Sequence, residues 1–381
     1  MKVVIAIDSF KGSLTSEQAG LAVASGIKKV YPTAQPRIFS MADGGEGTLE
    51  TLARSTNCKI NEITVTGALG APICARYGVT EKGKVIVETA NVAGLTLLDE
   101  SERNPLNTTT YGMGEIIKNC VEQGYRDFIV GLGGSATNDG GVGMLQALGF
   151  EFLDGDGKQI PLGAKGLELL RSICTEKAVA GLRDCRFQIA CDVKNPLCGE
   201  KGCSEVFAPQ KGGTKEIIKR MDEWLLNYAD LTQKTLGVDF KNVEGVGAAG
   251  GLGFAFCAYL NGELRSGIEL IASVTGLEEE ICRAEVVVTG EGRLDGQTGM
   301  GKVPVGVAKI AKKYALPVVA FSGAVTKDAD ACNKVGIDAF FPILGEPCTL
   351  ERAMQEDYAR ENLERTAEQA FRLIQAFSQK D

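Results

Sequence analysis

The sequence contains no histidine. This absence excludes an imidazole as general base, as partner of a nucleophile and as metal ligand. Any chemistry must therefore use carboxylates, lysines, arginines, hydroxyl groups, thiols or backbone amides. The chain also has a single tryptophan, and its 41 Lys and Arg against 49 Asp and Glu give a net charge of −8. Without a basic tail, this balance argues against a nucleic-acid-binding surface and favours small solutes as partners.

Cysteine pairs of the Cys-x-x-Cys type are also missing, although the chain has 12 cysteines. Four of them follow one another at irregular intervals without histidine partners, which disfavours a zinc site: Cys185, Cys191, Cys198 and Cys203. Free thiols are typical of a reducing compartment, and Met1–Ile7 is too short for the apolar region of a secretory signal. We therefore expect a cytoplasmic protein.

Long apolar runs are absent as well, since no stretch reaches the ~18 apolar residues that span a membrane. The longest uncharged run, 246–260, carries four glycines and predicts a buried helix packed through its glycines. Glycine itself is abundant: 48 of 381 residues, about 13%, against roughly 7% in ordinary proteins. This excess, which has no Gly-x-y period, indicates that backbone comes close to other groups.

The order of predicted elements indicates an α/β fold. Strand-like runs rich in β-branched residues occur at 2–7, 37–41, 128–132, 286–289, 318–321 and 339–343. Amphipathic helices are predicted over 15–30, where Thr15 and Gln18 have capping-box spacing, and over 349–377. Strands that alternate with helices favour a doubly wound, mostly parallel, Rossmann-like sheet.

Two stretches, 60–98 and 150–160, break this alternation and are typical of antiparallel hairpins. We therefore predict a second α/β domain inserted into the first, with the active site in the cleft between the two domains. The predicted Rossmann-like domain comprises 1–58, 106–149 and 282–381, and the inserted domain comprises 59–105 and 150–281.

Ligands of an open parallel sheet bind beyond the carboxyl ends of its strands. Four loops at predicted strand ends are rich in Gly, Asp, Glu and Ser: 8–13, 42–48, 131–141 and 289–295. Each loop alone could be an ordinary turn, but four at one sheet edge favour a binding site. We expect these loops to converge in space.

The loop at 131–141 is the strongest candidate for anion binding. A strand, then glycines, then a predicted helix would direct the amides of Gly133, Gly134 and Ser135 at a phosphate. Residues 131–136 also fit the dinucleotide fingerprint G-x-G-x-x-A, with Glu151 20 residues beyond Gly131. Glu151, however, enters a predicted hairpin rather than a parallel strand, which disfavours a nicotinamide site.

The available groups suit phosphoryl transfer, which needs carboxylates for Mg²⁺ and cations for phosphate oxygens. Asp43, Glu291 and Asp295 are the candidate metal ligands, and Lys11 and Arg293 are the candidate cations. The alternative for these side chains is an exposed, salt-bridged turn.

Asp192 and Asn195, fixed by the following Pro196, form a candidate catalytic pair or an Asx-type turn. Lys302 lies in a segment with Walker A spacing, but Val303 replaces the Ser or Thr that would bind Mg²⁺, so this is not a P-loop. Lys302 is either a phosphate ligand or a solvated lysine. The remaining candidate ligands of substrate or nucleotide are Asp8, Ser9, Ser13, Gly44, Gly45, Asn138, Asp139 and Lys211.

Taken together, these motifs resemble the type 1 glycerate kinase family. The resemblance rests on ordered blocks at 8–13, 42–48, 131–141, 191–197, 208–212, 247–253 and 289–295, so it covers essentially the whole chain. It implies a kinase that uses ATP and Mg²⁺ to phosphorylate D-glycerate, most often at the 2-hydroxyl group, with the site between two α/β domains.

On this basis we predict a kinase with ATP phosphates on the amides of the 131–141 loop and with Asp192 accepting the proton of the glycerate hydroxyl. Asp295 is the second candidate for that role. Two alternatives remain at this point: a nicotinamide-dependent hydroxy-acid dehydrogenase, and a non-catalytic sensor of a small anionic metabolite. The sequence does not indicate the oligomeric state.

Overall fold

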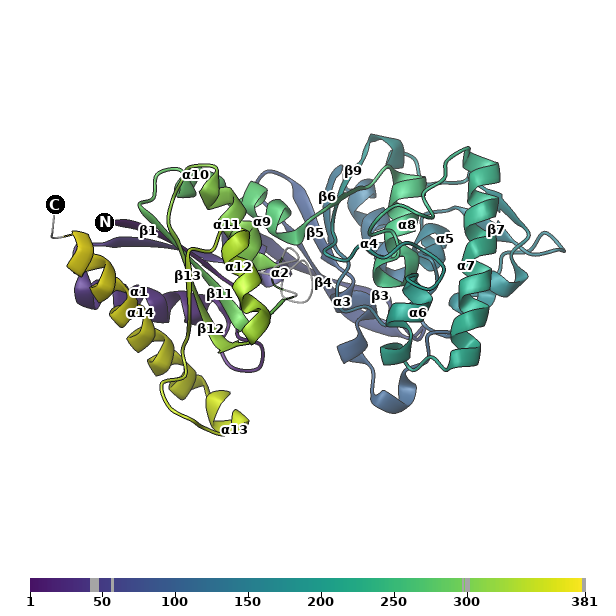
Figure 1. Cartoon of the computed structure of the whole chain (residues 1–381). Coiled ribbons are helices and arrows are strands. Elements are labelled where there is room, and N and C mark those ends of the chain that lie inside the picture. The colour runs from purple at the N-terminus through teal and green to yellow at the C-terminus, as the bar shows by residue number, and fades with distance from the viewer. Residues whose placement is uncertain (42–47, 56–57, 297, 299–301, 379–381) are drawn as a thin grey trace. The chain divides into compact units, whose positions relative to one another are not determined.

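The computed structural model describes residues 1–41, 48–55, 58–296, 298 and 302–378 (Figure 1). The chain divides into two compact units. Unit 1 comprises Met1–Asp43 and Ile268–Asp381, and unit 2 comprises Gly44–Gly267. Each unit contains helices and a sheet with parallel strands, which confirms the predicted α/β class.

Unit 1 is built on a five-stranded, fully parallel sheet with the order β13-β12-β11-β1-β2. Its strands are β1 (Lys2–Ile7), β2 (Gln35–Ser40), β11 (Val286–Leu294), β12 (Val318–Val325) and β13 (Ala339–Pro342). The continuous apolar run of β1 is explained by its central place, since residues pointing to both faces of the sheet are buried.

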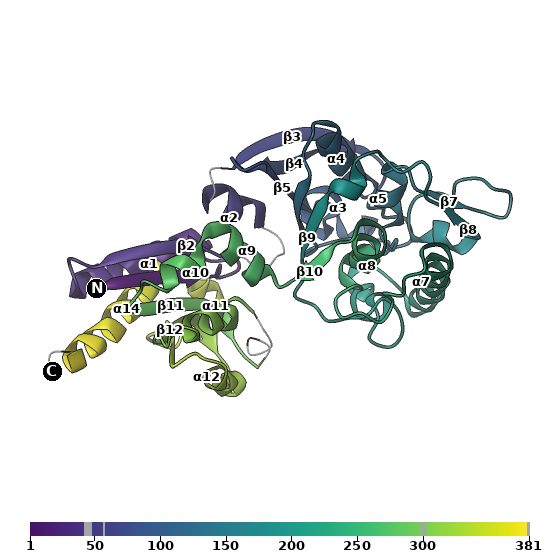
Figure 2. The same cartoon turned by 90° about the horizontal axis from the view of Figure 1, so that it is seen from above.

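Helices cover both faces of this sheet. α1 (Ser16–Val30) and α14 (Glu356–Ser378) lie side by side and share one apolar core with Val3, Ile5 and Ile7 of β1 (Figures 1 and 2). α11 (Val303–Lys312) also contacts β1, β11 and β12. The shorter helices of unit 1 are α10 (Leu277–Ile281), α12 (Ala331–Lys334) and α13 (Leu350–Ala353).

Unit 2 contains a six-stranded mixed sheet with the order β10-β9-β6-β5-β4-β3. Strands β5, β6, β9 and β10 are parallel, whereas β3, β4 and β5 run antiparallel to their neighbours in a meander. The strand bounds are β3 (Lys59–Thr66), β4 (Pro72–Val79), β5 (Lys84–Glu88), β6 (Asp127–Gly131), β9 (Arg186–Ala190) and β10 (Glu263–Arg265). A separate antiparallel pair consists of β7 (Glu151–Leu153) and β8 (Ser172–Cys174).

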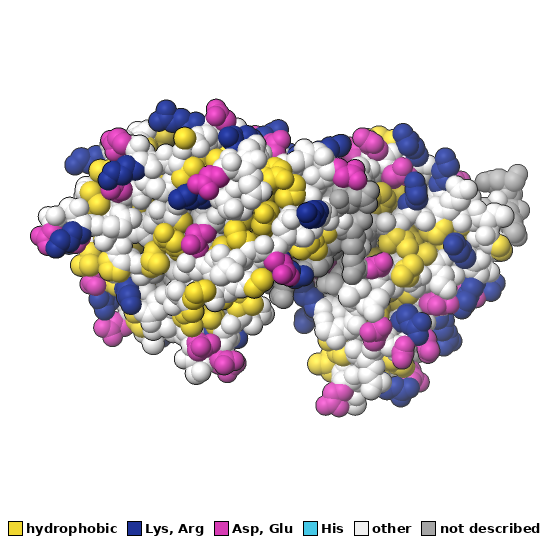
Figure 3. All heavy atoms as spheres, turned by 180° about the vertical axis from the view of Figure 1, so that it is seen from behind, with side chains coloured by type: hydrophobic (Ala, Val, Ile, Leu, Met, Phe, Trp, Pro, Cys, Tyr) yellow, Lys and Arg dark blue, Asp and Glu magenta, His cyan; other side chains and the backbone are white. Residues whose placement is uncertain are grey.

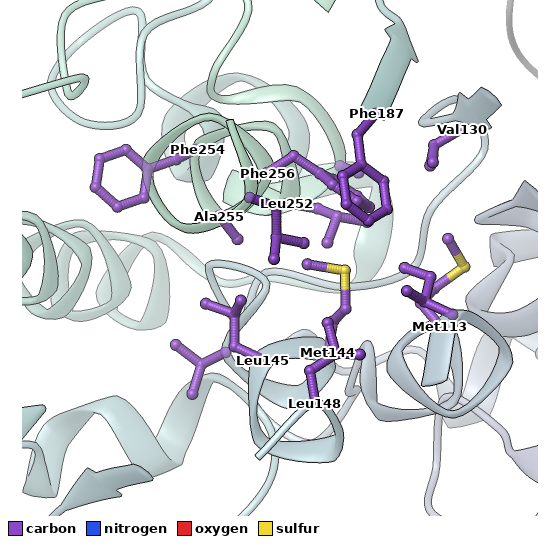
Figure 4. Close-up of a cluster of buried hydrophobic side chains, with 14 of the residues drawn as sticks. Met113, Val130, Met144, Leu145, Leu148, Phe187, Leu252, Phe254, Ala255 and Phe256 are labelled. Carbon is purple, nitrogen blue, oxygen red and sulfur yellow. The ribbon is translucent and has the colours of Figure 1, made fainter. Parts of the chain in front are cut away.

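The helices of unit 2 are α2 (Thr48–Ser55), α3 (Ala90–Ala93), α4 (Tyr111–Glu122), α5 (Val142–Ala147), α6 (Cys203–Phe207), α7 (Lys215–Leu236) and α8 (Ala248–Leu260). α9 (Gly267–Thr275) begins at the boundary between the units. Figure 4 shows the centre of the core, where Met144 and Leu145 of α5 point toward Leu252 and Ala255 of α8.

The predicted Gly-packed helix is confirmed as α8, whose residues are almost all buried. Its first turn is unusual because Ala249, Gly250 and Gly251 have left-handed backbone conformations. A Cβ atom on Gly250 would lie 2.1 Å from the carbonyl oxygen of Thr137, so the backbones of α8 and of the 131–141 loop are in direct contact. Glycine here serves the close approach that its abundance suggested.

The predicted domain boundaries differ from those of the structure. Residues 106–149 were expected in the first domain, but β6 pairs with β5 and β9 and therefore belongs to the sheet of unit 2. Residues 44–58 and 268–281 also change sides. A buried parallel strand has the same composition in either sheet, and the sequence does not specify its partners.

Two local predictions also need correction. The 150–160 segment turns as expected, with Asp154 N donating to Lys158 O, but β7 finds its ladder partner in β8. The helix expected over 349–377 is divided into α13 and α14. The hairpin predicted within 60–98 is confirmed by the β3–β4 and β4–β5 ladders.

No helix among the described residues has the length and apolar character needed to cross a lipid bilayer. Acidic and basic side chains are interspersed over the face of the molecule shown in Figure 3.

Candidate active site

The turn after β1 places its polar and apolar residues on different sides. Phe10 and Leu14 form two backbone hydrogen bonds of 2.8 and 3.0 Å, which close a tight loop. Phe10 and the Asp8 side chain are buried, Lys11 is exposed, and Ser9 N donates to Asp8 Oδ1 at 2.7 Å. The loop therefore presents Lys11 beyond the carboxyl end of the central strand. The predicted capping box then starts α1, with Thr15 accepting from Gln18 N.

The end of β11 gathers four charged groups. Thr298 Oγ1 donates to Glu291 Oε1 at 2.5 Å, and Lys302 Nζ lies 3.9 Å from Glu291 Oε2 and 4.0 Å from Asp295 Oδ1. Arg293 Nε lies 3.5 Å from Asp295 Oδ2. Burial raises the pKa of the Glu291 carboxyl, and the Thr298 hydrogen bond and the Lys302 charge oppose that rise. Glu291 is thus a sheltered carboxylate beside an ammonium group.

These two segments line one pocket of about 330 Å³ in unit 1. Its charged lining residues are Asp8, Lys11, Glu291, Arg293 and Lys302, and Ser9 and Ser13 also line it. The predicted convergence of the turns at 8–13 and 289–295 is therefore confirmed. The third predicted loop, 42–48, falls on residues 42–47, so Asp43, Gly44 and Gly45 lie outside the described residues.

Glu291 and Asp295 fit the donor chemistry of a magnesium site. Both carboxylates lie within 4.0 Å of the same Lys302 Nζ, so their oxygens are close together, and Mg²⁺ prefers such oxygen ligands. Within the part of the chain that the structure describes, however, no group of three or more Cys, Asp or Glu side chains could hold a metal ion.

The glycine loop at 131–141 lies in unit 2, at the carboxyl end of β6. Gly134 O accepts from Leu95 N at 2.8 Å, and Ala136 N donates to Ala93 O at 2.8 Å, so the loop is fastened to α3 and the turn after it. The amides of Gly133, Gly134 and Ser135 do not start a helix as expected, because α5 begins only at Val142. The dipole of α5 therefore does not act on them.

Asp139 is a structural centre of this loop rather than an exposed ligand. Its fully buried carboxylate accepts hydrogen bonds from the backbone or hydroxyl groups of Thr109, Thr110, Gly141 and Gly143 at 2.8–3.4 Å. Burial raises the pKa of this carboxyl, and the hydrogen bonds oppose the rise. The contact ties the loop to the start of α4 and answers the question of whether the threonines of 104–111 are caps or ligands.

Lys211 is also turned inward. It is 3% exposed, and its Nζ donates to Ser135 Oγ at 2.9 Å and to Thr137 O at 2.7 Å. Burial lowers the pKa of this ammonium to about 8, although the nearby Cys203 thiol and Asp139 carboxyl act in the opposite direction. Asn138 is fully buried and donates to Ser204 Oγ at 2.9 Å. The structure thus brings Ser135, Asn138 and Lys211 together inside unit 2.

We expect the buried Lys211 ammonium to make the free energy of unfolding rise with pH. The folded pKa of about 8 lies below the ordinary 10.5, so between these values the unfolded chain binds a proton that the folded chain does not. The gain across this window is roughly 3 kcal/mol. Urea denaturation of the wild type and Lys211→Met at pH 7 to 10 should show a growing difference in favour of the wild type. Parallel pH profiles would refute this assignment.

Asp192 and Asn195 follow β9 in unit 2. Asp192 is exposed, and its Oδ1 accepts a hydrogen bond from Gly267 N at 3.0 Å. Asn195 Nδ2 donates to Lys201 O at 2.8 Å. The amide that was expected to orient Asp192 is thus directed at the 199–202 turn, and Asp192 receives a backbone amide instead.

Sequence reasoning missed one buried carboxylate and one pocket wall. Glu88, at the end of β5, is 2% exposed and accepts from Leu49 N at 2.8 Å and Asn91 Nδ2 at 2.6 Å. Its position directly after an apolar strand was the available signal. The pocket of unit 1 is also lined by Leu350 and Ala353 of α13, which was predicted only as part of a longer helix.

The comparison with protein families decides among the interpretations of these sites. The model of the "Glycerate kinase family" matches residues 3–375. The chain belongs to the glycerate kinase family. Related proteins include a "Glycerate kinase" of Bacillus subtilis (strain 168), 44% identical over 368 residues that cover 96% of each chain. A "Glycerate 2-kinase" of Escherichia coli (strain K12) is 44% identical over 359 residues, 94% of each chain.

A solved glycerate kinase structure has the same fold. It is described as the "putative glycerate kinase 2 from Salmonella typhimurium LT2" and superimposes with a TM-score of 0.88 at 42% identity, over 100% of this chain and 99% of that chain. The predicted family membership is therefore confirmed. The dehydrogenase alternative is not supported, and Glu151 lies in β7, which is antiparallel to β8 rather than part of the parallel sheet.

Proposed function

We propose that this chain is an ATP-dependent kinase that transfers a phosphoryl group to the 2-hydroxyl group of D-glycerate, giving 2-phospho-D-glycerate and ADP. The observation that carries the proposal is the match of nearly the whole chain to the glycerate kinase family. The 2-hydroxyl group is chosen because the Escherichia coli relative is named a glycerate 2-kinase. The charged pocket of unit 1 supplies groups that suit this chemistry.

Each charged group has a proposed role. Lys11, Arg293 and Lys302 balance the negative charge of the phosphates and of the glycerate carboxylate. Glu291 and Asp295, together with Asp43, would hold Mg²⁺, which neutralises charge on the transferred phosphoryl group. Their short distances to Lys302 and Arg293 show that carboxylates and cations already share one site.

Asp192 is the proposed acceptor of the proton of the glycerate hydroxyl, and Asp295 is the second candidate. The exposed Asp192 carboxylate is held from one side by the Gly267 amide, which leaves Oδ2 as the oxygen for proton transfer. Gly133 and Gly134, at the accessible part of the 131–141 loop, are proposed to contact substrate through their amides. Ser135, Asn138, Asp139 and Lys211 shape that loop from within.

A cytoplasmic location fits the cysteine chemistry, because all 12 cysteines are free thiols. Burial raises the pKa of several of them, to about 12 for Cys120, Cys203 and Cys257. Such thiols are structural rather than reactive.

The deciding experiment is incubation with D-glycerate, ATP and Mg²⁺, followed by identification of the product by phosphorus NMR. We expect 2-phosphoglycerate and ADP in equal amounts. Formation of 3-phosphoglycerate would refute the choice of hydroxyl group. Binding of both compounds without ADP formation would indicate the sensor function, and a fluorescence titration that shows NADH binding in place of ATP would indicate a dehydrogenase.

A further inference from the structure

The pocket of unit 1 has an apolar wall that the charged groups do not explain. Opposite part of its lining is aliphatic: Ala324, Ile343, Leu344, Leu350, Ala353 and Met354. Glycerate is a small polar acid, and phosphates bind to cations and amides. Neither ligand uses an aliphatic surface, so the wall calls for a third chemical group.

The wall is formed by one face of α13 and the residue after it. Leu350, Ala353 and Met354 have the i, i+3, i+4 spacing that places side chains on the same side of a helix. Met354 also reaches the turn after β1, since a Cβ atom on Gly12 would lie 2.7 Å from its terminal methyl group. The apolar wall is therefore adjacent to the loop that presents Lys11.

Several contacts hold α13 in place. Thr349 Oγ1 accepts from Arg352 N at 3.3 Å and caps the helix. The Arg352 guanidinium lies 3.2 Å from Glu346 Oε1 and 4.8 Å from the centre of the Tyr358 ring. These contacts use the polar side of α13, which leaves its apolar side directed at the pocket.

The exposure of this apolar side is unusual. Leu350 is 77% exposed and Met354 is 36% exposed, although both line a pocket. Apolar groups of this kind are stabilised when a flat apolar ligand covers them, and a methionine thioether packs favourably against an aromatic ring. A pocket of about 330 Å³ is within the usual range for small-molecule sites, which begins at roughly 300 Å³.

We infer that the wall formed by Leu344, Leu350, Ala353 and Met354 binds the purine base of ATP, with the triphosphate extending to Lys11, Arg293 and Lys302. The inference rests on the proposed function, because it takes ATP as the phosphoryl donor. It moves the triphosphate from the expected amides of Gly133 to Ser135 to the strand ends of unit 1. The side chains of the wall carry no hydrogen-bonding group, so the base is held by packing.

The test compares ATP with inorganic tripolyphosphate, which lacks the base, by isothermal titration calorimetry in the presence of Mg²⁺. The wild type should bind ATP at least about 10-fold more tightly than tripolyphosphate, a difference of about 1.4 kcal/mol. Ala353→Trp fills the wall and should weaken ATP binding by about 10-fold, while tripolyphosphate affinity stays within about twofold. Glu351→Trp, on the same helix but outside the pocket lining, is the matched control and should change neither affinity.

Leu350→Ser gives a second reading that does not depend on accommodating a large side chain, since Leu350 is largely exposed. It should weaken ATP binding by about threefold and leave tripolyphosphate binding unchanged. Unchanged ATP affinity in both pocket variants, or equal losses of ATP and tripolyphosphate affinity, would overturn the inference. Binding needs no turnover, so a protein that shows this pattern but forms no phosphoglycerate would refute the proposed function and still support the base site.

Discussion

Replacing Asp192 by asparagine is expected to lower kcat for glycerate phosphorylation by about 10²–10⁴-fold, with ATP affinity within about twofold of the wild type. The amide cannot accept the proton of the glycerate hydroxyl. Its oxygen can still accept the hydrogen bond from Gly267 N, which is 3.0 Å long in the structure, so the local backbone should be preserved. Steady-state kinetics combined with calorimetric ATP binding separates the lost chemistry from lost binding.

Asp184→Asn is a matched control, because Asp184 is an exposed carboxylate just before β9 whereas Asp192 follows the same strand. We expect its turnover to stay within about twofold of the wild type. Near-normal turnover of Asp192→Asn would remove Asp192 from the mechanism and direct attention to Asp295. In the pH–rate profile, Asp192→Asn should also lose the acidic limb that a carboxylate base produces.

Asp139→Asn is expected to cost about 3–5 kcal/mol of the free energy of unfolding, although the side chain keeps its size. Both carboxylate oxygens accept hydrogen bonds: Oδ1 from Gly141 N, and Oδ2 from groups of Thr109, Thr110 and Gly143. Whichever way the new amide is oriented, its NH₂ group faces N–H or O–H donors in a fully buried site. Chemical denaturation should show the loss as a lower midpoint.

The exposed Asp184→Asn variant also serves here, with an expected change within about 0.5 kcal/mol. A small loss in Asp139→Asn would mean that the carboxyl is protonated in the folded protein, since a neutral acid already tolerates a donor at one oxygen. That outcome is distinguishable, because the wild type would then lose stability as the pH is raised, and Asp139→Asn would not.

Local features of unit 1 were predictable from the sequence. The apolar run at 2–7 became β1 with the same bounds, and Thr15 and Gln18 form the predicted capping box, because a strand buried on both faces and a helix cap each depend on neighbouring residues. The convergence of 8–13 and 289–295 followed from the rule that parallel strands end at one sheet edge.

Features that depend on distant residues were not predictable. The run at 128–132 indicates a buried strand, but only its pairing with β5 and β9 assigns it to unit 2. Asp139 and Lys211 look like ligands in a glycine-rich setting, yet Thr110 and Ser135, far away in the sequence, turn them inward. The direction of a loop side chain depends on such remote partners rather than on its own motif.

The contact between α8 and the 131–141 loop limits how these two segments can diverge among relatives. A Cβ on Gly250 would lie 2.1 Å from Thr137 O and 2.5 Å from Asn138 Cα, both backbone atoms that no change of rotamer can move. A mutation at position 250 therefore cannot be compensated by a second mutation in the loop, only by displacing the loop as a whole. The same loop carries the exposed Gly134 and the buried anchor Asp139, so natural selection on catalysis and on folding would act on Gly250 together.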